Sequence, residues 1–126
     1  MIVLTSDEIV ELHDMLLTAS GGSPGLLDQG LLESAVLGCC QSFGGDDLYP
    51  TVIEKAARLA YAICKNHPFV DGNKRVAVVS MLVLLRMNSI VLSYTQSELV
   101  ILGIGIADGG ISYKAILMWI HAHSVE

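Results

Sequence analysis

Nine consecutive residues in the middle of the chain combine groups that can act on a phosphate. The segment from His67 to Arg75 reads His-Pro-Phe-Val-Asp-Gly-Asn-Lys-Arg, and an apolar run, Val76 to Leu85, follows it directly. A polar loop that leads into a helix lies at the helix N-terminus, where free backbone N–H groups and the positive end of the dipole attract anions. Two cations in that first turn are unfavourable without an anion, so the segment predicts a phosphate site.

The side chains of this segment match the needs of phosphoryl transfer to a protein hydroxyl. That reaction requires a base, a metal ion that bridges phosphates, and donors for negative charge. We expect His67 to be the base, because an imidazole titrates near neutral pH. We expect Asp71 to bind Mg²⁺, which prefers oxygen ligands and takes the rest from phosphates and water.

The second half of the segment supplies groups that hold a phosphate. Gly72 lets the backbone approach a ligand closely, so the N–H groups of residues 72–74 form a candidate cradle. Asn73 adds an amide to it. Lys74 and Arg75 are expected to neutralise phosphate charge, the guanidinium through two parallel hydrogen bonds.

Each of these residues alone also has an ordinary structural interpretation. Asp71 is a common N-cap, His67 a loop residue bonded to backbone, and Gly72 with Asn73 a common turn. Lys74 and Arg75 are common solvated charges. Their combination in this order, directly before an apolar helix, favours the functional interpretation.

The segment resembles the signature of the Fic/Doc family, and more closely that of its death-on-curing (Doc) branch. The Fic branch reads His-Pro-Phe, two variable positions, Gly-Asn-Gly-Arg, and a second Arg three residues on. Lys74 stands where that motif has its second Gly, and Val78 where it has the second Arg; both departures match the Doc pattern. The similarity extends to Leu12-His13-Asp14, Leu31-Leu32-Glu33-Ser34-Ala35, Tyr49-Pro50 and Lys55-Ala56-Ala57.

The resemblance assigns roles to the matching residues. It implies that His67 is catalytic, that Asp71 binds the metal and that Arg75 binds phosphate and is catalytic with His67. It places Asn73 in the anion-binding loop. Phe69 is implied to be the structural anchor that buries its ring and holds the loop.

The resemblance also implies a function. Family members transfer AMP or a phosphoryl group from a nucleotide to a protein hydroxyl, and the Doc-like motif favours phosphoryl transfer from ATP or another nucleoside triphosphate, with Mg²⁺. The implied protein is the toxin of a type II toxin–antitoxin pair, acting on a Ser or Thr of a translation elongation factor and arresting growth. An antitoxin is expected to cover the active-site groove. The alternatives are AMP transfer, and a catalytically silent helical binding module.

Composition sets limits on these interpretations. A chain of 126 residues with 52% hydrophobic residues fits one compact domain, residues 1–126. The formal net charge of -6 argues against direct nucleic-acid binding. No secretory signal is expected, because the apolar start, Met1 to Leu4, is too short and lacks basic residues. No membrane span is expected, because the apolar run is short and bounded by Arg75 and Arg86. We expect reduced, buried thiols in a cytoplasmic protein, at Cys39, Cys40 and Cys64.

Helix signals recur along the chain and predict an all-α fold. Asp28 and Ser112 can each cap a helix, and Pro50 suits the first position of another. The helix before the motif should end near Asn66, because Pro68 moves the preceding residue out of the helical region. Capping boxes are predicted for Thr5 with Glu8, Thr51 with Glu54, and Thr95 with Glu98.

These elements predict a compact bundle of about six helices around a buried central one. The central helix should start near Gly72 or Asn73 and run to about Asn88. We expect it to be buried, because it is apolar on nearly every side. The segment Ser20 to Gly25 is a loop that either contacts a ligand or simply connects helices. Four further residues are expected to be structural: His13 on the surface or in a groove, His121 and His123 at a helix end, and Trp119 in the core.

Overall fold

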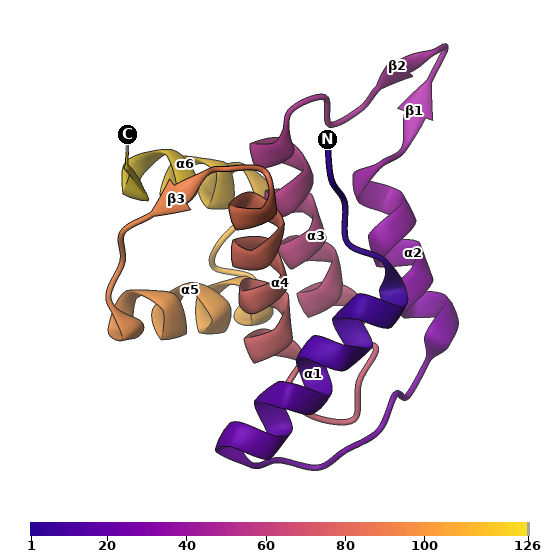
Figure 1. Ribbon diagram of the computed structural model, residues 1–126, viewed down its shortest axis with the longest axis vertical. Coiled ribbons are helices and arrows are strands. Elements are labelled where there is room, and N and C mark those ends of the chain that lie inside the picture. Colours follow the sequence, from indigo (N-terminus) through magenta and orange to yellow (C-terminus); the bar gives the residue numbers. More distant parts are fainter. Residues whose placement is uncertain (126) are drawn as a thin grey trace.

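The computed structural model describes residues 1–125 and is an all-α bundle (Figure 1). Two pairs of very short antiparallel strands accompany the helices, β1 with β2 and β3 with β4. The predominance of helices confirms the predicted all-α fold class. The helices are α1 Ser6–Ser20, α2 Gln29–Cys39, α3 Val52–Asn66, α4 Asn73–Met87, α5 Gln96–Asp108 and α6 Tyr113–His123, and the strands are β1 Ser42–Phe43, β2 Asp46–Asp47, β3 Val91–Leu92 and β4 Ser124–Val125.

The central helix is α4, as the apolar run predicts. Figure 1 shows it in the middle of the bundle, with α3 beside it, α1 running diagonally past its lower end and α5 on the other side. Its inward side chains are buried on several faces, because it packs against all three neighbours. Since α4 begins at Asn73, the polar loop lies at one end of the most buried helix. The buried residues of α4 are Asn73, Val76, Ala77, Val78, Ser80, Met81, Leu84 and Leu85.

The predicted caps are confirmed with one correction. The boxes at Thr5 and Thr95 are complete, and Asp28 and Ser112 cap α2 and α6. The box at Thr51 is wrong in part: its hydroxyl accepts from the Glu54 N–H at 3.1 Å, but the Glu54 carboxylate accepts from that hydroxyl and not from backbone. Because Thr51 is the cap, Pro50 precedes it and is not the first helical residue.

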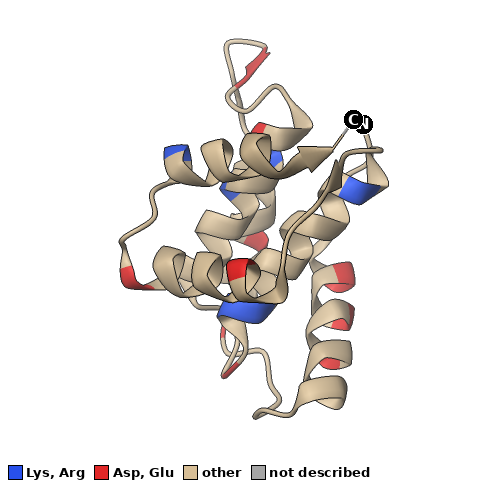
Figure 2. Cartoon of the chain, turned by 90° about the vertical axis from the view of Figure 1, so that its left-hand side faces the viewer, with Lys and Arg blue, Asp and Glu red and all other residues tan. Residues whose placement is uncertain are grey.

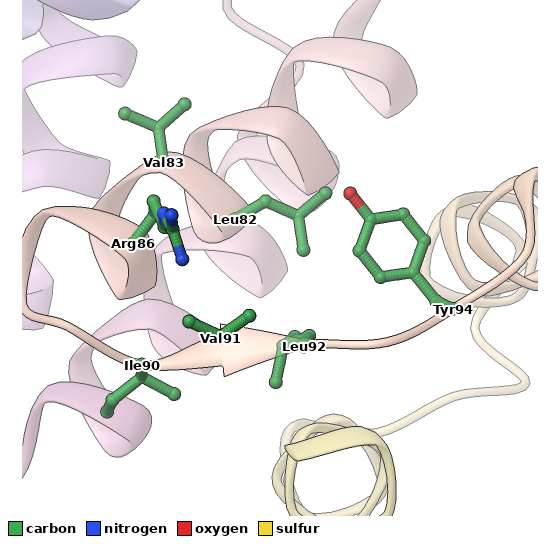
Figure 3. Close-up of a pocket in the computed structure, with 7 residues that line it drawn as sticks. All are labelled: Leu82, Val83, Arg86, Ile90, Val91, Leu92 and Tyr94. Atoms are coloured by element: carbon green, nitrogen blue, oxygen red, sulfur yellow. The ribbon is translucent and has the colours of Figure 1, made fainter. Parts of the chain in front are cut away.

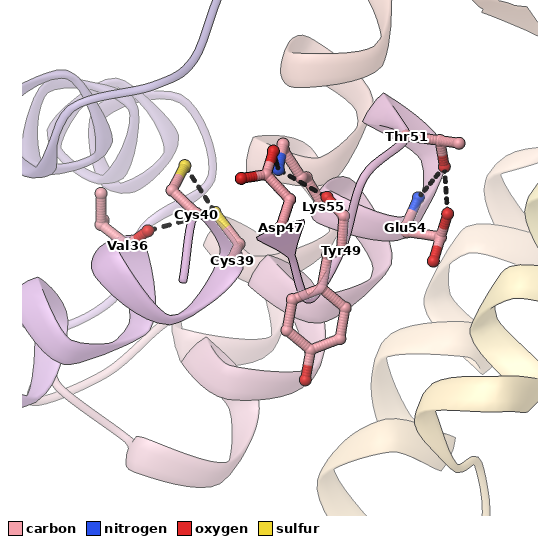
Figure 4. A network of polar contacts seen from close by, with 8 residues as sticks. All are labelled: Val36, Cys39, Cys40, Asp47, Tyr49, Thr51, Glu54 and Lys55. Atoms are coloured by element: carbon pink, nitrogen blue, oxygen red, sulfur yellow. Dashed lines mark hydrogen bonds and ion pairs between the residues drawn. The ribbon is translucent and has the colours of Figure 1, made fainter. Parts of the chain in front are cut away.

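A buried lysine fastens the β1–β2 hairpin to α3 (Figure 4). Lys55 is 4% exposed, and its ammonium donates to the Asp47 carboxylate at 3.2 Å and to the Tyr49 carbonyl. These bonds satisfy a charge that would otherwise be costly to bury.

The cysteine prediction is correct for two residues and wrong for one. All three are free thiols, and Cys39 and Cys64 are buried, but Cys40 is exposed because it caps the end of α2. Burial, with Cys40 nearby, raises the pKa of Cys39 to about 12, and burial raises the pKa of Cys64 to about 11. The Sγ atoms of the neighbouring pair lie 3.8 Å apart (Figure 4).

The far end of α4 carries an apolar hollow of about 350 Å³, well away from the polar loop (Figure 3). It lies between the last turns of α4 and the β3 segment. Among residues 1–125, no helix has both the length and the apolar character that a membrane crossing requires. The hollow is lined by Leu82, Val83, Arg86, Ile90, Val91, Leu92 and Tyr94.

An ion pair joins the end of α6 to the start of α5. His123 Nε2 donates to the Glu98 carboxylate at 2.7 Å, and Nδ1 donates to the Trp119 carbonyl at 2.7 Å. Both partners only accept, so the ring is an imidazolium. The hydrogen bond to Glu98, followed by that to Trp119, raises the pKa of His123; the bond from His123, followed by the Thr95 backbone, lowers the pKa of Glu98.

Replacing His123 with Gln is expected to lower stability only within a limited pH window. Because the pKa of His123 is raised by folding, its protonation stabilises the fold at low pH, and this stabilisation is lost as pH rises through the raised pKa. Because the pKa of Glu98 is lowered, its ionised form stabilises the fold at higher pH, and this stabilisation is lost as pH falls through the lowered pKa. The difference in Tm from the wild type should therefore peak between about pH 4.5 and about pH 6.5. Thermal melts from about pH 3 to about pH 9 test this, and a difference independent of pH would contradict it.

Candidate functional site

The motif loop, residues 67–72, joins the end of α3 to the start of α4. Helix α3 ends at Asn66 as predicted, and His67 takes a left-handed conformation with φ 53°. This turns the chain, so that the Phe69 ring is buried at 1% exposure while the His67 side chain remains exposed. The burial of this ring fits the anchoring role that the resemblance implies for Phe69.

The Asn73 side chain braces this loop from within. Its Oδ1 accepts from the Phe69 N–H at 2.9 Å, and its Nδ2 donates to the Phe69 carbonyl at 2.9 Å and lies 3.1 Å from His67 Nδ1. An amide nitrogen only donates, so Nδ1 accepts and neutral His67 carries its proton at Nε2. The buried amide is committed to the loop, and its expected role toward an anion stays a prediction.

Asp71 presents an ionised carboxylate at the surface. Its Oδ2 accepts from the Ser23 N–H at 3.0 Å and its Oδ1 from the Gly72 N–H at 2.8 Å. These bonds, with that to Ser23 the stronger influence, lower the pKa of Asp71, and the Arg75 charge contributes further.

The donor set around Asp71 fits Mg²⁺ only in part. Within residues 1–125, no three His, Cys, Asp or Glu residues cluster as a metal cage. One carboxylate fits an ion that takes most of its ligands from phosphates and water, as Mg²⁺ does. The Gly72 N–H already binds Asp71, so the expected backbone cradle has fewer free donors than the sequence suggested.

The loop Ser20 to Gly25 contacts the motif directly. The Arg75 guanidinium donates to the Ser20 hydroxyl and to the Gly21 carbonyl at 2.9 Å, and the Val70 N–H donates to the Gly25 carbonyl at 3.0 Å. The sequence left open whether this loop contacts a ligand or only connects helices. The structure shows that it does more than connect them, because it forms hydrogen bonds with two expected site residues, Asp71 and Arg75.

Replacing Gly22 with Ala is expected to disturb the site. Gly22 has φ +128°, and a Cβ would lie 2.7 Å from Leu17 Cδ2, 2.8 Å from Arg75 Nη2 and 3.0 Å from Asp71 Oδ2. Combined strain and overpacking should lower the free energy of unfolding by about 1–3 kcal/mol. Gly21→Ala is the matched control: its φ is +82° but its Cβ would meet nothing within 4 Å. Urea unfolding of both variants measures the difference, and equal losses would show that the close contact is unimportant.

One open cavity of about 400 Å³ collects the predicted residues. It lies at the start of α4, and the end of α5 closes one side. Lys74 is exposed at its edge and Arg75 is half-buried. The structure thus brings together the candidate base, the candidate metal ligand and two cations. The cavity is lined by Cys64, His67, Val70, Asp71, Gly72, Asn73, Lys74, Arg75 and Ala107.

A larger apolar groove of about 530 Å³ opens beside this cavity and shares Lys74 and Arg75 with it. It runs between α1, α4 and α5, so its walls come from segments far apart in the sequence. Val100 and Ile104 are half exposed there. The remaining lining residues are Leu16, Ala19, Ser20, Val78, Val79, Gln96, Leu99 and Gly103.

The two cations stand out in an acidic molecule. Residues 1–54 contain no Lys or Arg, and Figure 2 shows α1 with acidic residues along its length. Three of the seven basic residues, Lys65, Lys74 and Arg75, lie in or near the motif. This concentration fits a small anion better than an extended polyanion.

The predicted exposure of His13, a residue next to the candidate site, was wrong. It was expected on the surface or in a groove, but it is 1% exposed and lies beneath the motif loop. The signal was present: His13 follows Ile9 by four residues and precedes Leu16 by three, the spacing of one buried helix face. His121 is exposed, and Trp119 lies half-buried with its ring stacked on His123.

The structure is an all-α domain whose buried central helix begins beside an exposed His, an exposed Asp and a half-buried Arg, which defines a helical protein with a candidate anion site at a helix start. Comparison with known proteins specifies the class further. The model of the Fic/DOC family matches residues 3–85. The chain is 33% identical over 113 residues to "Protein kinase doc" of Escherichia phage P1, spanning 90% of this chain and 88% of that protein. It is 36% identical over 89 residues to "Toxin Doc" of Mycolicibacterium smegmatis, spanning 68% of each. The chain therefore belongs to the Fic/Doc family.

Proposed function

We propose that this protein is a Doc-type toxin that transfers a phosphoryl group from a nucleoside triphosphate to a Ser or Thr hydroxyl of a protein. The observation that carries the proposal is the cavity at the start of α4, which holds His67, Asp71, Lys74 and Arg75 together. The names of the two relatives, a kinase and a toxin, support it. A translation elongation factor in the cytoplasm is the proposed target, and growth arrest the outcome.

We assign a separate role in the reaction to His67 and to Asp71. The target hydroxyl oxygen attacks the terminal phosphorus, its proton passes to His67, and the bond to the nucleoside diphosphate breaks. Because Asn73 occupies Nδ1 in this structure, the imidazole must leave Asn73, or move its proton to Nδ1, before it can accept. Asp71 would hold Mg²⁺, which would supply positive charge to offset that of the phosphates.

The two cations are proposed to bind the phosphates. Arg75 donates to the Ser20–Gly25 loop in this structure, so phosphate binding requires the guanidinium to share or leave those partners. Lys74 is exposed and free to turn toward a ligand. Charge-assisted bonds to phosphate are stronger than those to a hydroxyl and a carbonyl, which favours the exchange.

Labelled ATP tests the transfer directly. Purified elongation factor is incubated with the protein, Mg²⁺ and ATP labelled on either the γ- or the α-phosphate. Label from the γ-position on the target supports phosphoryl transfer, and label from the α-position would establish the alternative, AMP transfer. If neither label moves and calorimetry with Mg²⁺ and nucleotide shows no heat, the chain is a silent binding module. Mass spectrometry of the product identifies the modified hydroxyl.

An antitoxin segment is the proposed occupant of the apolar groove between α1, α4 and α5. The groove shares Lys74 and Arg75 with the cavity, so a segment lying in it would block access to the phosphate site. Its apolar walls suit the apolar face of an amphipathic helix.

Replacing Val100 with Asp is expected to weaken antitoxin binding about tenfold or more, because the charge would be buried against apolar side chains. Met118→Asp, at an exposed apolar position of α6 outside the groove, is the control. Co-purification with a small protein encoded beside this one measures the effect. Equal retention of that partner by both variants would place the antitoxin elsewhere.

A further inference from the structure

The buried imidazole of His13 joins α1 to the backbone of the motif loop. Its Nε2 lies 2.7 Å from the Asp71 carbonyl oxygen. Its ring stacks on Phe69, with centroids 3.9 Å apart and planes 12° apart. A Cβ on Gly72 would lie 3.4 Å from the same Nε2. One side chain therefore contacts Phe69 and the Asp71 backbone and lies beside Gly72.

The chemistry of these contacts defines the state of His13. A carbonyl oxygen only accepts, so Nε2 carries a proton and donates it. The other nitrogen, Nδ1, lies 3.9 Å from the exposed Asp14 carboxylate, too far for a hydrogen bond. His13 is thus held as a donor aimed at a single oxygen, with its ring face against Phe69.

The residue that His13 holds is the candidate metal ligand. The Asp71 carboxylate reaches Ser23 and Gly72 from a backbone whose carbonyl is fixed by His13. Without that donor, the carbonyl would be free to turn, and the Asp71 side chain would lose its fixed direction. Groups that orient a metal ligand typically affect metal affinity by about 10–100-fold when removed.

We propose that His13 is a positioning residue: its Nε2–H fixes the Asp71 backbone, and through it the carboxylate that binds the Mg²⁺–nucleotide. This proposal rests on the proposed function for its consequence in binding. Its local part, the fixed loop geometry, is independent of any activity. A histidine that merely filled space would stabilise the loop through the packing of its ring alone. The test therefore has to distinguish the effect of the ring from that of the Nε2–H donor.

Two substitutions separate them. His13→Phe keeps a ring that can stack on Phe69 but removes the donor, whereas His13→Gln removes the ring but places an amide N–H at a similar reach. His121→Gln, at an exposed histidine of α6, is the control. If the Phe variant fails to fold, His13→Met replaces it, because Met is similar in length to Gln and has no donor.

The first readout is hydrogen exchange at the Ser23 and Gly72 amides, which both donate to Asp71. We expect exchange to accelerate in His13→Phe and to return toward the wild-type rate in His13→Gln. The second is calorimetric titration with Mg²⁺ and a non-hydrolysable ATP analogue, where His13→Phe should bind about 10–100-fold more weakly and His13→Gln should recover most of the affinity.

Two outcomes would overturn the proposal. Unchanged exchange in the variants without a donor would show that His13 Nε2 does not fix the loop. If His13→Gln and His13→Phe lose protection and affinity alike, and each loss only follows the fall in Tm, the residue only fills space. If the wild type binds no nucleotide, the proposed function fails, while the exchange rates alone still decide the role of His13.

Discussion

Replacing His67 with Ala is expected to lower the transfer rate by about 10²–10⁴-fold, the range that a general base contributes. The loss should appear in kcat and leave nucleotide affinity nearly unchanged, because the cations and Asp71 remain. The fold should tolerate the change, since the His67 side chain is exposed and its ring has one hydrogen bond among the described residues, from Asn73. The measurement is single-turnover transfer of the γ-label with saturating nucleotide.

The control for this prediction is His121→Ala, which removes another exposed imidazole from a helix distant in sequence. It should retain the wild-type rate, so a general effect of losing a histidine is excluded. Full transfer by His67→Ala would mean that a different group accepts the proton. A loss confined to KM would mean that His67 binds substrate and is not the base.

Replacing Asn73 with Ala is expected to have the largest effect on stability. The side chain is 4% exposed and satisfies both backbone groups of Phe69 at 2.9 Å each. Leaving a buried donor and a buried acceptor without partners costs about 1–3 kcal/mol each, so we expect a loss of about 3 kcal/mol in the free energy of unfolding. Transfer should also fall, because the loop that carries His67 and Asp71 loses its brace.

Urea unfolding measures this loss, with Asn66→Ala as the control. Asn66 is half-buried, and its amide also donates to a backbone carbonyl, that of Leu31 at 3.0 Å, but this bond is exposed to water. Water can replace that bond, so the control should lose no more than about 1 kcal/mol. Equal losses in both variants would show that Asn73 does not brace the motif loop.

Local sequence signals predicted the elements well, because caps and helix breakers act over a few residues. Thr5, Thr95, Asp28 and Ser112 cap the helices that they were expected to cap. The boundary at Pro68 was also predicted correctly, since a proline restricts only the residue before it. Pro50 was misplaced by a single position, because two adjacent residues, Pro50 and Thr51, both suit a helix start.

The partners of the motif side chains were predicted less well. Asn73 and Arg75 were expected to bind an anion, and this stays a prediction. The sequence did not indicate their partners within the protein: Asn73 bonds to Phe69, and Arg75 donates to Ser20 and Gly21, more than fifty residues earlier in the chain. His13 was read as a surface or groove residue, yet it lies under Phe69. Residue types indicate which bonds a side chain can form but not which partner lies within reach.

The amino-acid sequence alone determined that this protein is all-α and that a helix buried on most sides follows the polar His67–Gly72 loop, and it named the residues that we expect to carry the chemistry. Hydrophobic periodicity, caps and a nine-residue motif are local properties, so they need no knowledge of the rest of the chain. Tertiary structure alone decided that the Ser20–Gly25 loop holds Asp71 and Arg75, that His13 supports the loop from α1, and that an apolar groove joins the cavity. Those features depend on the packing of α1 and α5 against α4, and no short stretch of sequence contains that geometry.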